Sequence, residues 1–487
     1  MSDRMRDEAD RLLNNALYFH RQGRLDEAHG IYRQVIRDNP EHAHAHHLLG
    51  LVTRHRGQER DANRYFQRAA EIAPDEALYR ATLADSHRQI GDDAAARREL
   101  EAIETLAFDD PDLRIQVATI WGLIGENAAA LDRCRPVIAM FPDHLRGNLL
   151  LGSLLSDRGD FEEALAALEK VRAADPNLPD PTCALASTLF ALGRHERILR
   201  LDAPPDPRQR FGEATLKATV LWLQGRMREA ASLVDASRAH DASLPDWPRK
   251  AVFRSMLDQL AGLLAFRDRH EAHYESAAHA TLTVVGDEQA MAAAGYIVTV
   301  AGQSTRLIGE PVFGCRAAHF VAGDNRFRAA YLASLARVPD GSRFVSLIGS
   351  LDCRISGLLA ELPPGAQENS SDMTPVDRLA SDYVDWLADT CRARDLTPIV
   401  AGTPATNVQV EVMRAIARST YLEIIERFNR RLAVAASRHG FAFVDLLGAT
   451  RSSGSATGRT GLYIDTNHIL PTGLVDALDR IETSSAS

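Results

Sequence analysis

The sequence has few cysteines and lacks the signatures of several large protein classes. Its five cysteines are widely spaced, odd in number and free of any CxxC pair, which argues against a disulfide framework and a structural zinc site. No P-loop, GxGxxG or metal motif is present, so we expect no cofactor and no metal. No run of 18 apolar residues occurs, and no apolar signal segment follows Met1, so we expect neither membrane insertion nor secretion.

Basic residues do not outnumber acidic ones. The chain carries 56 Lys and Arg against 66 Asp and Glu, a net charge of −10, which argues against a nucleic-acid partner. Its 487 residues are 45% hydrophobic and 25% charged, as expected for several globular domains. These features predict a cytoplasmic protein whose thiols are reduced.

What the sequence does contain is a repeat of 34 residues in its first half. Glycine recurs at this interval from Gly23 to Gly193, and alanine lies five residues after each of these glycines except the last, where Ile198 stands. A small residue lies seven positions before each glycine: Ala16, Gly50, Ala84, Ala118, Gly152 and Ala186. A further contact position is filled by Tyr32, Phe66, Leu100, Cys134 and Leu168, so we interpret Cys134 as a core residue.

This pattern predicts two helices per repeat. The small residue and the alanine allow the two backbones to approach closely, and the glycine ends the first helix where a positive φ is often needed. The repeats resemble tetratricopeptide repeats (TPR) over about residues 6–205, and Gly225 and Ala230 indicate a weaker seventh unit. The resemblance implies an α-solenoid whose concave groove binds an unidentified protein or peptide. The segment LDAPPDPRQR (201–210) replaces the second helix expected of repeat six.

Four histidines begin the first helix of repeat two: His42, His44, His46 and His47. His42 and His46 are four residues apart and could together bind a metal. No HExxH motif or carboxylate arrangement accompanies them, so we favour a solvated or groove-lining helix face.

From about residue 281 the pattern changes to short β-rich runs that alternate with longer helical segments. This alternation predicts a mostly parallel sheet covered on both faces by helices, a three-layer α/β/α domain. The expected strands are 281–285, 343–349, 397–402 and 441–446, and the expected helices include 376–395 and 412–440. Because sites in such folds lie at the carboxyl ends of strands, the candidate residues are those that follow each strand: Gly286, Asp287, Glu288, Gly349, Ser350, Asp352, Arg354, Asp465 and His468.

The order and spacing of these segments resemble the SGNH/GDSL hydrolase superfamily, and in particular a bacterial branch with GDSH and GEIDCR blocks. The corresponding blocks here read GDEQ (286–289) and GSLDCR (349–354), and DTNHILP (465–471) resembles the closing D-x-x-H block. The resemblance covers about residues 281–475. It implies that Asp465 orients the imidazole of His468, as in a catalytic triad.

The sequence departs from this family at decisive positions. Glu288 stands where the family has its nucleophilic serine, Leu351 where it has the oxyanion-stabilising asparagine, and Ser350 where the branch has a glutamate. Either Gly314 or Gly323 could serve as the second-block glycine. A carboxylate at position 288 could not form the same acyl-enzyme, and its charge would repel an oxyanion.

Several interpretations of this site remain open. Ser350 could replace the missing nucleophile, Glu288 and His468 could activate water as general bases, or the cleft could bind a ligand without turning it over. Glu288 could also simply satisfy backbone amides at a helix N-terminus. Cys353 follows a buried strand, which favours packing over nucleophilic use.

We therefore predict an α plus α/β multidomain protein. Its expected parts are a TPR solenoid (1–205), a degenerate repeat with a helical connector (206–280), an SGNH-like domain (281–475) and a flexible tail (476–487). The catalytic candidates are His468, Asp465, Glu288 and Asp287, and the ligand-binding candidates are Asp352, Arg354, Ser350, Gly349 and Gly286. We expect an interaction scaffold with a degenerate or rewired hydrolase domain. The alternative is an active esterase or acyltransferase on an acylated carbohydrate or related ester, as in surface-polysaccharide metabolism.

Overall fold

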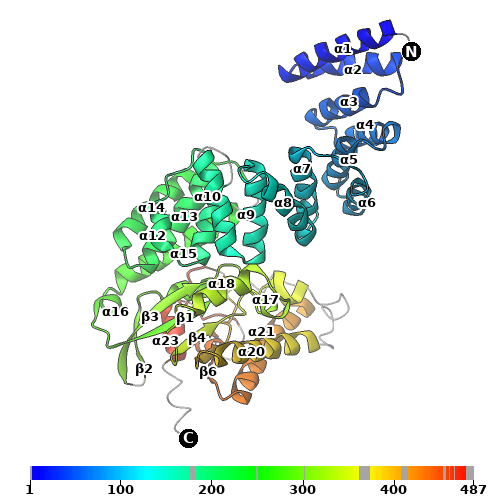
Figure 1. The fold of residues 1–487 in the computed structure, drawn as a ribbon. Coiled ribbons are helices and arrows are strands. Elements are labelled where there is room, and N and C mark those ends of the chain that lie inside the picture. The colour runs from blue at the N-terminus through cyan, green and yellow to red at the C-terminus, as the bar shows by residue number, and fades with distance from the viewer. Residues whose placement is uncertain are drawn as a thin grey trace. The chain divides into compact units, whose positions relative to one another are not determined.

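A computed structural model describes residues 3–175, 181–247, 250–300, 302–360, 373–406, 415–452, 457–459, 461–465 and 467–478 (Figure 1). The chain divides into two compact units, Met1–Leu154 and Leu155–Ser487. Most of the predicted tail, residues 479–487, and the first residues of the helix predicted over 412–440 lie outside the described residues.

The first unit consists of helix pairs that follow the 34-residue repeat. Its helices are α1 (Asp3–Arg21), α2 (Leu25–Asp38), α3 (Ala43–His55), α4 (Glu59–Ile72), α5 (Ala77–Gln89), α6 (Asp93–Ile103), α7 (Pro111–Leu123), α8 (Asn127–Met140) and the greater part of α9 (Leu145–Arg158).

The residues that define the repeat behave as their spacing predicts. The repeat glycines from Gly23 to Gly193 all have φ between 67° and 98°, which an L side chain adopts only with strain. A Cβ at Gly50 would lie 2.5 Å from Cε1 of Phe66, so the two helices of that repeat can pack this closely only with glycine. The five contact residues are completely buried: Tyr32, Phe66, Leu100, Cys134 and Leu168.

The second unit begins with further helices: α10 (Phe161–Ala174), α11 (Pro181–Ala191), α12 (His195–Leu199), α13 (Pro207–Leu223), α14 (Met227–Asp241), α15 (Lys250–Arg269) and α16 (Ala272–Glu275). Helix α12 has only five residues, because the proline-rich segment 201–210 interrupts the second helix of repeat six. Helices α13 and α14 form the predicted seventh pair, in which Gly225 has a φ of 75° and Ala230 is buried.

A six-stranded sheet follows, in the order β2-β3-β1-β4-β5-β6. The strands β3, β1, β4, β5 and β6 run parallel, and β2 pairs with β3 in antiparallel fashion. Their bounds are β1 (Ala280–Gly286), β2 (Ile297–Val300), β3 (Gln303–Pro311), β4 (Arg343–Leu347), β5 (Thr397–Ala401) and β6 (Ala442–Val444). The mostly parallel sheet and the four strands predicted from the sequence are confirmed, whereas β2 and β3 were not predicted.

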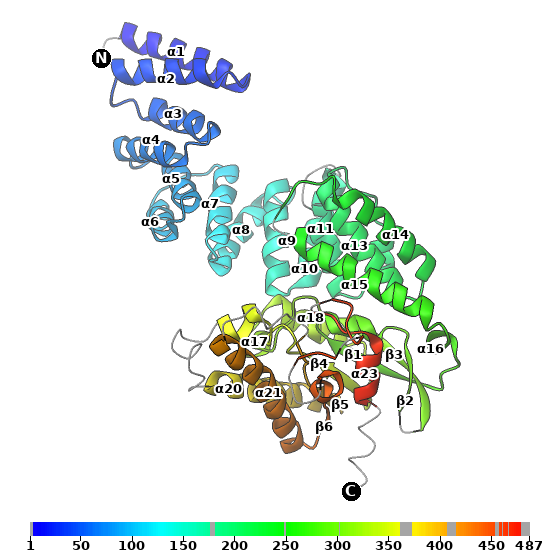
Figure 2. The same cartoon turned by 180° about the vertical axis from the view of Figure 1, so that it is seen from behind.

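Apolar side chains cover both faces of this sheet. On one face, Val285 and Phe344 join a core with helices α17 (Ala318–Val321), α18 (Arg326–Leu335), α20 (Thr374–Arg392) and α21 (Ala415–Arg438). On the other face, Val284 and Val345 join a second core with η1 (Glu288–Ala293), α22 (Leu446–Thr450), α23 (Pro471–Leu478) and helices α13–α15. Figure 2 shows the sheet with α20 and α21 and with α23. One of the two helical layers is therefore partly supplied by the repeat array.

Candidate functional site

The predicted strand-end residues gather where β1 and β4 end. Across the sheet the parallel strands lie in the order β3-β1-β4-β5-β6. If these five strands are numbered 1 to 5 along the chain, this order is 2-1-3-4-5. The strand order reverses between β1 and β4, and open α/β sheets bind ligands at such a point. Asp287 follows β1 and Ser350 follows β4, so these two residues flank it.

Two glycines allow the backbone to approach this point closely. A Cβ at Gly286 would lie 2.1 Å from the carbonyl oxygen of Leu347 on the neighbouring strand. Gly349 has a φ of 122°, and a Cβ there would lie 2.4 Å from Cε1 of Phe428. Both residues, predicted as ligand-binding, thus shape the backbone beside the site.

Asp287 is fully buried and connects the two strand ends. Its Oδ2 accepts hydrogen bonds from the backbone nitrogen (3.2 Å) and the hydroxyl (2.6 Å) of Ser350, and its Oδ1 accepts one from the nitrogen of Gln289 (3.1 Å). Burial, together with the negative charge of Glu288, raises the pKa of Asp287 to about 7. Burial therefore favours the protonated form of this carboxyl group.

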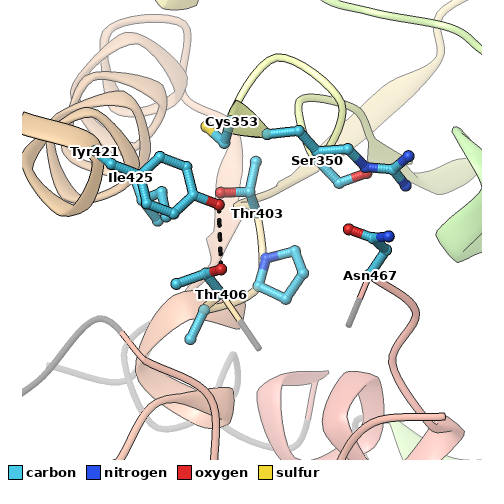
Figure 3. A pocket seen from close by; sticks show the side chains of 10 residues that line it. Ser350, Cys353, Thr403, Thr406, Tyr421, Ile425 and Asn467 are labelled. Atoms are coloured by element: carbon cyan, nitrogen blue, oxygen red, sulfur yellow. Dashed lines mark hydrogen bonds between the residues drawn. The ribbon is translucent and has the colours of Figure 1, made fainter. Parts of the chain in front are cut away.

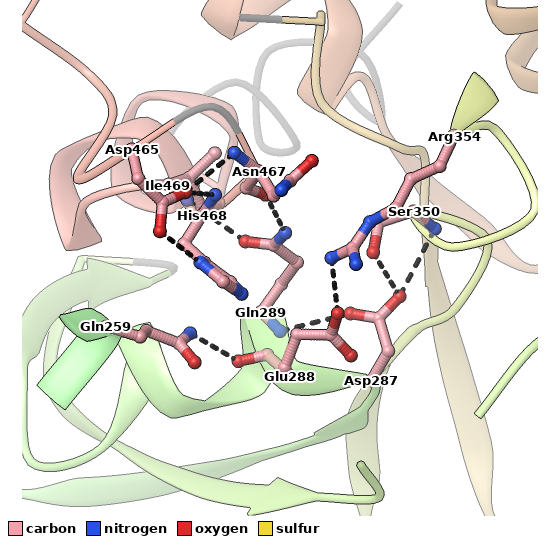
Figure 4. Close-up of polar contacts among 10 residues, drawn as sticks. All are labelled: Gln259, Asp287, Glu288, Gln289, Ser350, Arg354, Asp465, Asn467, His468 and Ile469. Atoms are coloured by element: carbon pink, nitrogen blue, oxygen red, sulfur yellow. Dashed lines mark hydrogen bonds and ion pairs between the residues drawn. The ribbon is translucent and has the colours of Figure 1, made fainter. Parts of the chain in front are cut away.

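Glu288 points to a different partner. Its carboxylate forms an ion pair with the guanidinium of Arg354 (Figure 4). Glu288 is the first residue of η1, but Asp287 supplies the N-cap by accepting from Gln289. The interpretation that Glu288 satisfies the amides at this helix end is therefore wrong, because its neighbour does so.

Gln289, which the sequence did not single out, holds the C-terminal segment. Its Nε2 donates to the carbonyl of Asn467 (2.5 Å), and its Oε1 accepts from the backbone nitrogen of Ile469 (3.0 Å). Three consecutive side chains thus reach three partners, as Figure 4 shows: Asp287 to Ser350, Glu288 to Arg354, and Gln289 to the D-x-x-H segment.

Asp465 and His468 form the hydrogen-bonded pair that their spacing predicts. Nδ1 of His468 lies 2.7 Å from Oδ2 of Asp465, whose Oδ1 accepts from the backbone nitrogens of Asn467 (2.7 Å) and His468 (2.9 Å). Burial by itself would raise the pKa of Asp465, but the hydrogen bond and charge of His468 lower it overall. Such a carboxylate fixes the orientation of the imidazole ring.

Asp352 lies apart from these contacts. It is completely buried, accepts hydrogen bonds from the backbone nitrogens of Ala317 (2.7 Å) and Ala318 (3.4 Å), and lies 3.5 Å from Nε of Arg316. These three contacts are with the segment that leads into α17, whereas Arg354, two residues on, pairs with Glu288.

Figure 3 shows a partly open pocket, which Arg354 of the ion pair helps to line. Polar side chains and a few apolar ones line it: Ser350, Cys353, Arg354, Thr403, Pro404, Ala405, Thr406, Tyr421, Ile425 and Asn467. Glu288 and His468, which are 7% and 3% exposed, are not among these residues. Burial raises the pKa of the Cys353 thiol, which fits packing better than nucleophilic use.

The two candidates for the second-block glycine differ in position. Gly314 comes three residues after β3, whose last residue Pro311 pairs with Gly286. Gly323 instead follows α17. Gly314 is therefore the candidate that directly follows a strand beside β1.

The histidines of repeat two make hydrogen bonds within the repeats. Nδ1 of His42 accepts from the nitrogen of Ala45 (3.3 Å), and Nε2 of His46 lies 2.9 Å from the carbonyl of Pro40. His46 and His47 are buried, so a solvated or groove-lining face is wrong for these two. Among the described residues, no group of three or more His, Cys, Asp or Glu is arranged to hold a metal ion.

The repeats match a known family. Residues 13–77 and 125–184 each match a tetratricopeptide-repeat model. These two segments therefore consist of tetratricopeptide repeats, an architecture that offers an extended surface to proteins or peptides. Both matched segments end before the sheet begins.

Several solved repeat proteins are similar to this chain. A tetratricopeptide repeat protein from Parabacteroides merdae is 14% identical with a TM-score of 0.40, covering 52% of this chain and 99% of its own. A thermophilic protein of the same kind from Thermus thermophilus is 21% identical with a TM-score of 0.31, covering 37% and 99%. YrrB, described as having an unusual peptide-binding site, is 14% identical with a TM-score of 0.30, covering 41% and 96%.

No curated protein matches the sequence. None of the described helices is long and apolar enough to cross a membrane.

Proposed function

We propose that this chain is an interaction scaffold whose repeats bind a protein or peptide and whose α/β domain is SGNH/GDSL-like but has lost serine ester hydrolysis. In this proposal the pocket beside Arg354 binds a ligand without turning it over. The repeats support the first part. The concave groove is the proposed binding surface.

The SGNH-like assignment is supported by where the blocks lie. The segments that begin at Gly286 and Gly349 follow adjacent parallel strands, and Gln289 connects the first of them to the Asp465–His468 segment. Gly314, which follows the strand beside β1, suits the role of the second-block glycine.

The ion pair of Glu288 with Arg354 carries the proposal that serine chemistry is lost. An acyl-enzyme requires a hydroxyl that His468 can deprotonate, and position 288 offers a carboxylate whose charge is already paired. An oxyanion formed here would meet this carboxylate, and Leu351 has no side-chain donor to stabilise it. The geometry thus favours binding over hydrolysis.

A panel of short-chain aryl esters and acetylated sugars tests this proposal. Purified wild-type protein and His468→Ala are compared at the same concentration. We expect the wild type to show no turnover above that of His468→Ala. Turnover that disappears in the variant would overturn the proposal.

The intact Asp465–His468 pair favours one alternative. With its imidazole oriented, His468 could act with Glu288 to activate water directly, which would make the domain an esterase or acyltransferase on an acylated carbohydrate or related ester. A place in surface-polysaccharide metabolism rests on the family resemblance alone. Hydrolysis that requires both His468 and Glu288 would establish this alternative.

We also propose a cytoplasmic location. The cysteines whose side chains are described, Cys134, Cys315, Cys353 and Cys391, are all buried free thiols. Unpaired buried thiols suit a reducing compartment.

A further inference from the structure

The last helices of the repeat array and the α/β domain share one hydrophobic core. Trp222 and Ala230 of the seventh repeat and Leu260 of α15 belong to the same buried cluster as Val284 of β1 and Met291 of η1. The indole nitrogen of Trp222 also donates a hydrogen bond of 3.1 Å to the carbonyl of Met291. The segment that follows β1 is therefore packed directly against the array.

One polar side chain of α15 reaches the site itself. Gln259 is completely buried, and its Nε2 donates to the backbone carbonyl of Glu288 at 2.8 Å (Figure 4). Among the described residues its Oε1 has no hydrogen-bond partner. Burying an amide group whose oxygen has no partner costs free energy that a leucine side chain would not cost. The hydrogen bond to the carbonyl of Glu288 is therefore the feature that accounts for glutamine at this position.

The same helix also contacts the D-x-x-H segment. A Cβ at Gly262 would lie 2.2 Å from Cγ2 of Ile464, so the missing side chain leaves space for Ile464 against α15. Ile464 directly precedes Asp465, and its nitrogen donates to the carbonyl of His468 at 2.8 Å. Within about one helical turn, α15 thus meets both the Glu288 segment and the segment that carries the Asp465–His468 pair.

We propose that Gln259 is a positioning residue of the site, supplied by α15, the helix that follows the seventh repeat pair. By holding the carbonyl of Glu288, it fixes the backbone from which the carboxylate reaches Arg354. Arg354 in turn lines the pocket next to Cys353. This inference rests on the proposed function, because the ligand-binding role of the pocket comes from there. The contact between Gln259 and Glu288 can nevertheless be tested without a ligand.

The test uses the full chain and the reactivity of Cys353, which is 6% exposed and lines the pocket. Gln259→Leu preserves the approximate volume of the side chain and removes the donor. The control is Thr219→Val on α13, a completely buried residue whose hydroxyl donates to the carbonyl of Thr215 in its own helix (2.9 Å). Modification of Cys353 by a small methanethiosulfonate is followed by peptide mass spectrometry, which separates it from the other cysteines.

We expect Gln259→Leu to speed the modification of Cys353 by about five- to tenfold, the factor that one buried hydrogen bond supplies. Thr219→Val should change the rate by less than about twofold, because its lost bond lies within one helix. Equal rates in the two variants, or an unchanged rate in Gln259→Leu, would overturn the proposal.

A second variant separates positioning from packing. In Gln259→Glu, a protonated carboxyl group can still donate to the carbonyl of Glu288, whereas a carboxylate cannot. The ratio of the Cys353 modification rate in Gln259→Glu to that in Gln259→Leu should therefore fall as the pH is lowered from 8 to 6. A ratio independent of pH would contradict the positioning role. This outcome can be told apart from that of the ester panel. If the wild type is inert on esters and the Cys353 rate is unchanged in Gln259→Leu, only the positioning role of Gln259 is rejected. If the wild type hydrolyses esters, only the proposed loss of hydrolysis is rejected.

Discussion

The carboxylate of Glu288 forms an ion pair with the guanidinium of Arg354, joining the segment after β1 to the turn after β4. The side chain of Glu288 is 10% exposed and that of Arg354 is 28% exposed. The pair therefore lies at the edge of the pocket, with its acidic partner almost out of contact with water.

Removing either partner should destabilise the second unit. Glu288→Gln and Arg354→Met should each lower the free energy of unfolding by about 2 kcal/mol, between the effects of exposed and of fully buried pairs. The double variant should lose about 1–2 kcal/mol less than the two single losses together. Urea denaturation of the four proteins measures this coupling, and strictly additive losses would show that the two groups do not interact.

The stability of the second unit should depend on the ionisation of Asp287. Its pKa in the folded chain is about 7, above the ordinary value of 3.8, so the folded chain binds more protons than the unfolded chain between these values. The stability that protonation contributes is complete below about pH 4 and is lost as the pH rises through about 7. Asp287→Asn should remove this dependence. Urea denaturation at pH 5 and pH 8 tests it, and equal pH dependence in the two proteins would exclude a raised pKa.

The same substitution should have opposite effects at two glycines. Gly286→Ala places a Cβ against the carbonyl oxygen of Leu347 and should cost about 3 kcal/mol through strain in the sheet. Gly30 lies inside α2 with nothing within 4 Å of its added Cβ, so Gly30→Ala should stabilise the first unit by about 0.5–1 kcal/mol through helix propensity. Thermal unfolding measures both, and a neutral Gly286→Ala would show that β1 and β4 do not approach this closely.

Gln289 should control the protection of the C-terminal segment. Gln289→Leu removes the acceptor of the Ile469 amide and the donor to Asn467, so the amide of Ile469 should exchange with solvent at least about tenfold faster. Asn429→Leu is a matched control, since this buried amide bonds to Thr403 and not to the segment. Hydrogen-exchange mass spectrometry is the measurement. Equal acceleration in both variants would point to a general loss of stability.

The sequence predicted the parts of the fold that depend on local periodicity. The 34-residue spacing of Gly23 to Gly193 is sufficient for the repeats, because each repeat packs mainly against its neighbours. Strand β3 was missed because its residues, QSTRLIGEP, are not a continuous apolar run, although Gly302 directly before them is a turn signal. Its strand conformation comes from pairing on both sides, with β1 and β2.

The candidate site was predictable only as a set of strand ends. Parallel strands bring their carboxyl ends to one edge, so the meeting of Asp287 with Ser350 follows from topology. The contacts of Gln289 with Ile469 and of Gln259 with Glu288 do not follow, because they depend on how distant segments pack in three dimensions. Asp352 illustrates the converse: it follows a strand, but the turn directs it to Ala317 instead of the pocket.

We propose that this domain carries no serine nucleophile. A fluorophosphonate probe tests it most directly, because the probe reacts with an activated serine whatever the natural substrate. After incubation, intact-protein mass spectrometry with peptide mapping locates any adduct. We predict no adduct on the folded wild type. A stoichiometric adduct that maps to Ser350 and is lost in His468→Ala would contradict the account and establish a relocated nucleophile.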